Sequence, residues 1–363
     1  MTLIDRRRLL GAALGLAAGT TAYPSSSAAA PMTYEEAARA ARAPLRTAPR
    51  ERELVRCATL AANSHNTQPW IFTTAANKIT ITPDLARRCP AVDPDDHHLF
   101  VSLGCAAENL VLGASGLGLR ANPLVNGDSI AIDLETAAPV QSALIDAITA
   151  RQSTRAKFDG RPVTTDTLRL LESACREEGV SAIILTDRTR IANVVDYVLQ
   201  GNSAQMRDKA FMDELVSWMR FSDADAVATM DGLFSRASGN PALPARIARP
   251  LLRLFFTESS ENSKYRGQIE SSAGIAVLVT DTDDKAHWIA AGRACQRFGL
   301  QATALGLKYA FVNQPVEVAA LRTQFASFLG IGGRRPDIVM RFGAGPDLPK
   351  SLRRPPEQVM RER

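Results

Sequence analysis

A near-repeat inside the chain constrains its fold more than any other feature of the sequence. Residues 104–119 (GCAAENLVLGASGLGL) align without gaps to residues 292–307 (GRACQRFGLQATALGL). The aligned identical pairs are Gly104/Gly292, Ala106/Ala294, Leu112/Leu300, Ala114/Ala302, Leu117/Leu305, Gly118/Gly306 and Leu119/Leu307. Such self-similarity predicts a chain built from two related halves. Because Ala, Gly and Leu are common residues, two unrelated core helices are the alternative explanation.

Both copies have the apolar spacing of a buried helix. In the first copy the apolar positions are Leu103, Ala106, Leu110, Ala114 and Leu117, and a Gly-Leu pair closes each helix. Small residues in the same stretch would let two such helices approach closely; these are Gly104, Cys105 and Ala107. A core shared by two halves around a pseudo-twofold axis requires that approach.

Strand-like segments alternate with the helical ones. Runs rich in apolar and β-branched residues predict strands at residues 70–74, 78–82, 129–134, 181–186, 274–280 and 337–342. The alternation predicts an α+β fold, with a first half at residues 31–145 and a second half at residues 146–363. Residues 202–263 interrupt it with Met-rich and aromatic sequence and a Gly/Pro-rich loop, which indicates an insertion. We expect a lid over an apolar ligand; the alternative is a segment that only packs on the core.

Bulk composition excludes some classes of function. Of 363 residues, 45% are apolar and 22% charged, as in ordinary globular proteins. The net charge of +5 is spread without a run of five like charges, so we expect no nucleic-acid partner. The five cysteines form no C-x-x-C pair and predict neither disulfides nor zinc, but buried small residues: Cys57, Cys89, Cys105, Cys175 and Cys295.

The amino terminus has the organisation of an export signal. Residues 5–11 (DRRRLLG) precede an apolar stretch at residues 12–22 and an Ala-rich segment that ends near residue 30. This order resembles a twin-arginine (Tat) signal, and the apolar run is too short to span a bilayer. We therefore exclude residues 1–30 from the fold and expect Tat-dependent export to the periplasm or cell envelope. An ordinary amphipathic helix, in a cytoplasmic protein, is the alternative.

A dense polar turn at residues 63–70 (NSHNTQPW) is the most specific local sequence. It leads directly into a predicted strand, and its side chains can hydrogen-bond a flat heterocycle. It resembles the P-S-x-x-N-x-Q-P-W signature of FMN-dependent nitroreductases, with Asn where Pro is usual. The resemblance implies a flavoprotein in which this turn contacts FMN through Asn63, Ser64, His65, Asn66 and Gln68.

Two basic segments resemble other parts of the same family. Residues 151–158 (RQSTRAKF) resemble the family's R-R-S-x-R-x-F motif, and Arg151, Ser153 and Arg155 match it best. Near the carboxyl end, Arg353 and Arg354 lie where family members hold the FMN phosphate. Arg side chains suit both phosphate and a flavin carbonyl. Taken singly, each segment could be a solvated basic turn or surface pair.

Ordinary nitroreductases carry the Arg motif before the Asn-Gln-Pro-Trp motif, whereas in this chain the turn at residues 63–70 precedes the Arg motif at residues 151–158. The homodimers of those nitroreductases build each FMN site from two subunits. One set of motifs in one chain implies one composite site in a monomer that imitates the dimer by internal duplication. With the export signal and insertion, the chain resembles the Acg-type branch of the superfamily, in which a lid covers the flavin. The resemblance also places the segment after the second repeat helix near the flavin, including Ala310, Phe311 and Asn313.

The resemblance implies NAD(P)H oxidoreductase chemistry, in which hydride passes through FMN to a small nitro or quinone acceptor. The flavin carries the reactivity, so we assign binding residues and no catalytic side chain. If residues 202–263 close over the flavin, sequestration or storage of FMN is the alternative function. A cofactor-free scaffold ranks last because the polar site residues are retained.

Adjacent histidines, His97 and His98, follow three aspartates and could suggest a metal site. The i, i+4 spacing that places two ligands on one helical face is absent, so we predict no metal. We interpret the segment as a polar loop that caps the first repeat helix through Asp95 and Asp96.

Overall fold

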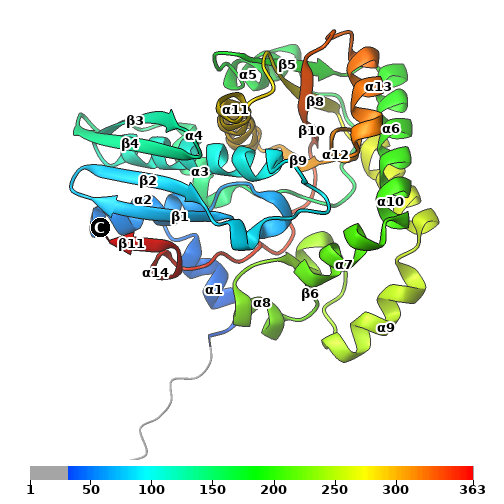
Figure 1. The fold of residues 1–363 in the computed structure, drawn as a ribbon, viewed down its shortest axis with the longest axis horizontal. Helices are drawn as coiled ribbons and strands as arrows, with labels where there is room; N and C mark the ends of the chain where they lie inside the picture. The colour runs from blue at the N-terminus through cyan, green and yellow to red at the C-terminus, as the bar shows by residue number, and fades with distance from the viewer. Residues whose placement is uncertain (1–31, 363) are drawn as a thin grey trace, which may run out of the picture. The chain divides into compact units, whose positions relative to one another are not determined.

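The computed structural model describes residues 32–362, apart from the side chains of residues 252–255. The predicted export signal at residues 1–30 lies outside the described residues. From Thr33 onward the chain forms one contact unit, and its division into two halves stays a prediction. A five-stranded sheet, a four-stranded sheet, a short two-stranded sheet and the helices around them make up this unit (Figure 1).

The first sheet has the strand order β11-β1-β2-β4-β3. Its strands are β1 (Trp70–Ala75), β2 (Lys78–Pro83), β3 (Leu119–Asn126), β4 (Ser129–Thr136) and β11 (Met360–Glu362). The strands β1 to β4 pair antiparallel, whereas β11 pairs parallel to β1. The last described residues of the chain therefore join the sheet of the first half.

The second sheet has the strand order β5-β8-β10-β9. Its strands, all antiparallel, are β5 (Val180–Leu185), β8 (Gly274–Thr280), β9 (Lys308–Phe311) and β10 (Arg335–Gly343). Every residue of β8 and β10 is buried, because each face of the sheet packs on a separate apolar cluster. All six strands predicted from the sequence are confirmed, within two residues at their ends.

The two repeat segments form the central helices α3 (His97–Gly116) and α11 (Lys285–Ala304). Each is followed by a leucine and a glycine with positive φ, +75° at Gly118 and +71° at Gly306. A Cβ added at Gly104 would lie 2.0 Å from the carbonyl oxygen of Ile289, and one added at Gly292 would lie 2.1 Å from that of Val101. The close approach predicted from the small residues is therefore present. α3 is apolar enough to cross a membrane, but 78% of its most apolar window is buried inside the protein, as in a core helix.

In the described part of the chain, seven more helices lie outside the two repeat segments and the interrupting segment. They are α1 (Tyr34–Ala41), α2 (Arg50–Thr59), α4 (Ala143–Ala150), α5 (Thr165–Ala174), α12 (Gln314–Glu317), α13 (Ala319–Leu329) and α14 (Pro356–Val359). A second apolar cluster joins one face of β8 and β10 to α6 (Arg188–Arg207), α10 (Glu258–Glu270) and α13.

The interrupting segment begins and ends inside helices. Residue 202 falls within α6 and residue 263 within α10, so both boundaries predicted for the insertion lie inside continuous helices. Between them lie α7 (Lys209–Trp218), β6 (Met219–Arg220), α8 (Asp223–Thr229), β7 (Leu233–Phe234) and α9 (Ala245–Phe255). This α7–α9 segment projects from the ends of α6 and α10 at the lower right of Figure 1.

Candidate functional site

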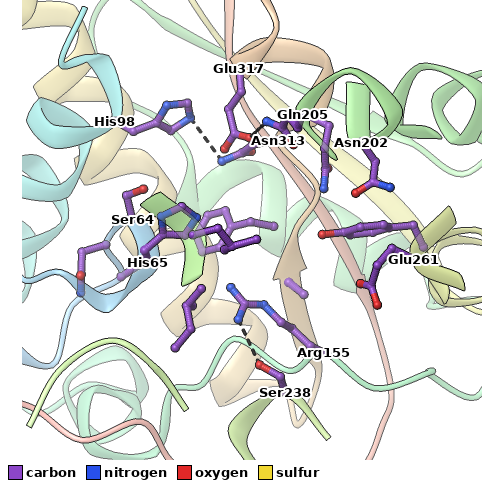
Figure 2. Close-up of a pocket in the computed structure, with 18 of the residues that line it drawn as sticks. Ser64, His65, His98, Arg155, Asn202, Gln205, Ser238, Glu261, Asn313 and Glu317 are labelled. Carbon is purple, nitrogen blue, oxygen red and sulfur yellow. Dashed lines mark hydrogen bonds between the residues drawn. The ribbon is translucent and has the colours of Figure 1, made fainter. Parts of the chain in front are cut away.

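A cavity lies where the polar turn after α2, the start of α3, the β9–α12 connection and the interrupting segment meet (Figure 2). Seven of the predicted cofactor-binding residues line it: Asn63, Ser64, His65, Arg155, Ala310, Phe311 and Asn313. The interrupting segment contributes apolar and polar wall residues, among them Met206, Phe211, Leu215, Ser238 and Glu261. Sequence segments more than 200 residues apart thus share one cavity.

The polar turn is held in a strained backbone conformation. His65, Asn66 and Gln68 have positive φ angles of 45°, 54° and 55°. The Asn63 Oδ1 atom accepts a hydrogen bond from the Gln68 backbone amide at 2.9 Å, so the residue that replaces the usual proline stabilises the turn. Burial and the nearby Arg155 lower the pKa of His65 to about 4, which keeps its imidazole neutral.

Two of the predicted turn ligands do not line the cavity. Asn66 donates to the carbonyl oxygens of Gly232 at 3.0 Å and Leu352 at 3.2 Å. Gln68 donates to the Met230 carbonyl at 2.9 Å and accepts from the Arg354 backbone amide at 2.8 Å. These amides tie the interrupting segment and the carboxyl-terminal segment to the first half.

The predicted cofactor-binding residues Arg151 and Arg353 lie outside the cavity lining, at the carboxyl end of α2. Arg353 donates to the carbonyl oxygens of Thr59 at 2.8 Å and Ala61 at 3.3 Å, and Arg151 donates to that of Leu60 at 2.8 Å. Cations at this end of a helix satisfy its free carbonyls and oppose its dipole. The structure therefore gives both arginines a helix-capping contact.

Further cations lie close to this capping site. Arg42 donates to the Thr149 carbonyl at 3.1 Å and Lys350 donates to the Ala150 carbonyl at 2.6 Å, both at the end of α4. Among the described residues no carboxylate pairs with Arg42, Arg151, Lys350 or Arg353. Burial and the neighbouring arginines hold the pKa of Arg353 well below its usual range.

Arg155 is the predicted arginine that does line the cavity. Its Nη1 donates to Ser238 Oγ at 3.3 Å, and its backbone carbonyl accepts from Gln268 at 2.8 Å. No ion pair to a carboxylate is present for Arg155 within residues 32–362. Its guanidinium is thus a cavity cation that is free to bind an anionic or carbonyl-bearing group.

Several cavity residues could not be found from the sequence. Glu317, on α12, accepts from Gln205 of α6 at 2.7 Å, and burial raises the pKa of this carboxyl. Asn202 lies three residues before Gln205 on α6, so the two side chains share one face of the helix. A polar residue on an otherwise amphipathic helix is normally solvent-exposed, so nothing in the sequence distinguished these three.

The α3 N-terminus is capped differently from the sequence prediction. Asp93 accepts from the backbone amides of His98 at 3.0 Å and Leu99 at 2.9 Å, whereas Asp95 and Asp96 make no such cap. Asp96 adopts φ +59°, and its carboxylate pairs with an arginine of the preceding turn. Asp95 and Asp96 are instead ion-paired with Arg335 and Arg88, so the cap comes from Asp93.

Two side-chain groups have spacings compatible with a metal ion. One is His65, Cys89 and Glu214; the other is Asp93, His97 and His98. Glu214 already accepts from two backbone amides, and burial raises the pKa of the Cys89 thiol above its usual range. In the second group the imidazole nitrogens are engaged in hydrogen bonds with Asp337 and Asn313.

No protein-family model matches the sequence. Two proteins provisionally named NAD(P)H nitroreductases, from Mycobacterium tuberculosis strains CDC 1551 and H37Rv, are each 27% identical over 338 residues. The alignments cover 86% of this chain and 93% of each relative.

Solved nitroreductase structures match part of the chain. The FMN-dependent nitroreductase NfnB of Mycobacterium smegmatis, in complex with NADPH, has a TM-score of 0.38 and 16% identity, and the match covers 56% of this chain and 87% of that one. A nitroreductase with bound FMN from Desulfitobacterium hafniense has a TM-score of 0.39 and 14% identity, with 59% and 96% covered.

Over most of its length the mixed α+β chain is therefore similar in sequence to two proteins named as nitroreductases.

Proposed function

We propose that this protein is an FMN-binding NAD(P)H oxidoreductase of the Acg-type branch of the nitroreductase superfamily. The observation that carries the proposal is the shared cavity. It brings the turn at Asn63 to His65, from the first half, together with Arg155 and Asn313 from the second. The names of the two sequence relatives agree with it, and so do the NADPH, FMN and NAD⁺ bound in solved nitroreductases and in an NADPH:FMN oxidoreductase from Vibrio harveyi.

The described residues fit FMN chemically. FMN has ring carbonyls, a hydroxylated chain and a phosphate, and the cavity cation Arg155 has no carboxylate partner in the described part of the chain. Among the residues that the structure describes, some polar atoms outside the cavity lining are buried without a hydrogen-bond partner, including Ser153 Oγ, Arg151 Nε and Arg42 Nε. Unpaired buried donors of this kind are expected where a ligand completes the hydrogen bonding.

In this proposal Arg155 holds the ring edge, while Arg151, Ser153, Arg353 and Arg354 provide charge and hydrogen bonds for the phosphate. When bound, FMN supplies the hydride-transfer chemistry from NAD(P)H to a small nitro or quinone acceptor. The protein positions the ring, excludes water and places positive charge beside it. The phosphate role is additional to the helix-capping contacts of Arg151 and Arg353.

Internal duplication and a monomeric state are part of the proposal. Under the alignment, position n in the first half corresponds to n + 188, which pairs Gly104 with Gly292 and Val101 with Ile289. The glycine contacts are reciprocal under this offset, because Gly104 approaches Ile289 and Gly292 approaches Val101. A self-complementary contact is the mark of a twofold interface, here within one chain.

Residues of the α7–α9 segment form part of the cavity wall, which supports a lid and keeps FMN sequestration as the second candidate. Residues 1–30 support Tat-dependent export, and thus a periplasmic or cell-envelope location.

Flavin binding is tested with Arg155→Met. We expect weaker FMN binding, measured by quenching of flavin fluorescence, because the cavity loses its cation. The control is Arg161→Met, whose side chain is 82% exposed and pairs with Asp159. Equal FMN affinity for both variants and the wild type, or colourless protein throughout, would refute the proposal.

Turnover and sequestration are separated by removing the α7–α9 segment. α6 and α10 are joined by the Arg207–Glu258 ion pair at 2.7 Å, so residues 209–257 can be replaced by a short linker without cutting either helix. If NADPH rapidly bleaches the flavin absorbance of the full-length protein in the absence of oxygen, the protein is a reductase. Bleaching only after the deletion indicates a closed, flavin-holding protein.

A further inference from the structure

A buried arginine holds the segment that carries the cavity cation Arg155. Arg341, on β10, is 0% exposed, and its Nη2 donates to the carbonyl oxygens of Thr154 at 3.0 Å and Ala156 at 2.8 Å. Its Nη1 donates to the carbonyl oxygen of Gln268, on α10, at 3.2 Å. One guanidinium thus links the second sheet, α10 and both sequence neighbours of Arg155.

Gln268 completes this arrangement. Its Nε2 donates to the carbonyl oxygen of Arg155 at 2.8 Å, while its own backbone carbonyl accepts from Arg341. The carbonyls of residues 154, 155 and 156 therefore each accept a hydrogen bond from a buried side chain.

These contacts determine where the Arg155 side chain points. A peptide group is planar, so holding its carbonyl oxygen restrains the whole group. The two peptide groups that meet at the Arg155 Cα are those with the carbonyls of Thr154 and Arg155, and both carbonyls are held. The φ and ψ angles of Arg155 then have little freedom, and its Cα–Cβ bond keeps one direction. Figure 2 shows the side chain in the cavity, where it reaches Ser238.

The aromatic residue of the motif-like segment supports the same arginine. Arg341 Cζ lies 4.1 Å from the ring centroid of Phe158, which is a cation–π contact. The Phe158 backbone amide donates to Ser271 Oγ at 3.1 Å, so the segment is also anchored beyond Ala156. No role for Phe158 followed from the sequence, and in the structure it packs on Arg341.

The charge of Arg341 is balanced by carbonyl groups. Within residues 32–362 no carboxylate pairs with it, and its Nε is buried without a hydrogen-bond partner. Burial lowers its pKa to about 9, so the guanidinium stays charged at neutral pH. A buried charge is costly unless hydrogen bonds compensate it. The charge of Arg341 and the backbone conformation of residues 154–156 therefore depend on each other.

We propose that Arg341 and Gln268 are positioning residues for flavin binding, which direct the Arg155 side chain into the cavity by holding the carbonyls of residues 154–156. This inference rests on the proposed function, in which Arg155 contacts the ring edge of the flavin. Arg341 does not line the cavity, so its effect on a ligand must pass through the segment that it holds.

The first test is a double-mutant cycle for FMN affinity with Arg341→Lys and Arg155→Met. Lysine keeps the positive charge but lacks the planar fork that reaches three carbonyls. We expect Arg341→Lys alone to weaken FMN binding about tenfold, as for the loss of one hydrogen bond to a charged group. In the Arg155→Met background the same change should weaken binding less than about twofold, because the contact through which it acts is already absent.

A merely structural role gives a different pattern. If Arg341 only stabilises the fold, Arg341→Lys lowers the urea midpoint, and the FMN affinity falls equally in both backgrounds or in neither. Either result overturns the proposal. The control is Arg335→Lys on the same strand, since Arg335 is also buried but pairs with Asp95 and Asp283, each at 2.9 Å. It should keep the wild-type affinity, and a tenfold loss in this control would equally count against a specific role of Arg341.

Gln268→Met keeps the proposal testable if Arg341→Lys does not fold. It removes the donor to the Arg155 carbonyl and leaves the backbone carbonyl that Arg341 uses. We expect weaker FMN binding in the wild-type background and less than about a twofold change in the Arg155→Met background. Gln268 also lines the cavity, so a loss that persists without Arg155 would indicate direct ligand contact and contradict the positioning role.

The last test needs no flavin. In a crystal structure of flavin-free Arg341→Lys, or of Gln268→Met, we expect the Arg155 guanidinium to lie beyond hydrogen-bonding distance of Ser238 Oγ. In Arg335→Lys it should stay in place. An unmoved Arg155 side chain in the first two variants would exclude the inference. Wild-type protein that binds no FMN would instead refute the proposed function, and these crystal structures would still decide the positioning role.

Discussion

The crossing of α3 and α11 provides the sharpest test of the fold. In Gly104→Ala the new Cβ would lie 2.0 Å from the carbonyl oxygen of Ile289 and 2.9 Å from its carbonyl carbon. Ordinary contacts of this kind are longer by more than about 1 Å. Because both partners are helix backbone, no side-chain rotation can relieve the overlap, and the helices must separate.

The expected cost follows from two opposing effects. Alanine gains roughly 1 kcal/mol over glycine as a helix former. Overpacking of a core costs about 1–3 kcal/mol, and more where rigid backbone must move. With the overpacking cost at the upper end of this range or beyond it, we expect Gly104→Ala to lower the free energy of unfolding by at least about 2 kcal/mol, a large part of the roughly 5–15 kcal/mol typical of a folded protein.

The measurement is the urea midpoint of the flavin-free protein, followed by far-UV circular dichroism. Gly113→Ala is the matched control on the same helix, where the nearest atom to the new Cβ is a Cys57 side-chain carbon at 3.3 Å. It should stay close to the wild type. In the double variant Gly104→Ala/Gly292→Ala the second change should cost less than the first, since the helices are already separated. A Gly104→Ala midpoint equal to that of Gly113→Ala would refute the close crossing.

Two further perturbations test the capping sites. In flavin-free protein, Arg353→Met should lower the free energy of unfolding by about 1–3 kcal/mol, because the carbonyls of Thr59 and Ala61 lose a charged donor; an unchanged urea midpoint would contradict the cap. Burial raises the pKa of Asp93, but the hydrogen bond and charge of His98 outweigh it and lower the pKa to about 2. The resulting stabilisation, about 2 kcal/mol, is present above about pH 4 and lost as the pH falls toward 2. Urea titrations across this pH range should show that the free energy of unfolding falls less on acidification for Asp93→Asn than for the wild type. An equal fall in both proteins would exclude this role of Asp93.

Much of the fold could be predicted because its core elements have clear periodicity. The six predicted strands and both repeat helices carry long apolar runs that no other structure would bury as well. β3 was missed because it contains Pro123 and alternates polar residues at a sheet edge, and β11 because it has only three residues. The predicted limits of the interrupting segment fall inside α6 and α10 because these helices continue past the change in composition.

The site was only partly accessible to sequence reasoning. Asn63, His65, Arg155 and Asn313 line one cavity because their segments are brought together by the fold. The sequence could not show which way the side chains of Asn66 and Gln68 point, since this depends on three positive φ angles in one turn. Nor could it show that Arg353 reaches the end of a helix almost 300 residues earlier.

The burial of all five cysteines has a consequence for following the protein in solution. None forms a disulfide, and burial raises the pKa of both Cys57 and Cys175 to about 12. A thiol so protected reacts with a modifying reagent only when its surroundings open. The cysteines are spread over the fold: Cys57 lies in α2, Cys89 before α3, Cys105 within α3, Cys175 directly after α5 and Cys295 in α11. The rate at which each cysteine is modified would therefore report the opening of its own region, without any introduced label.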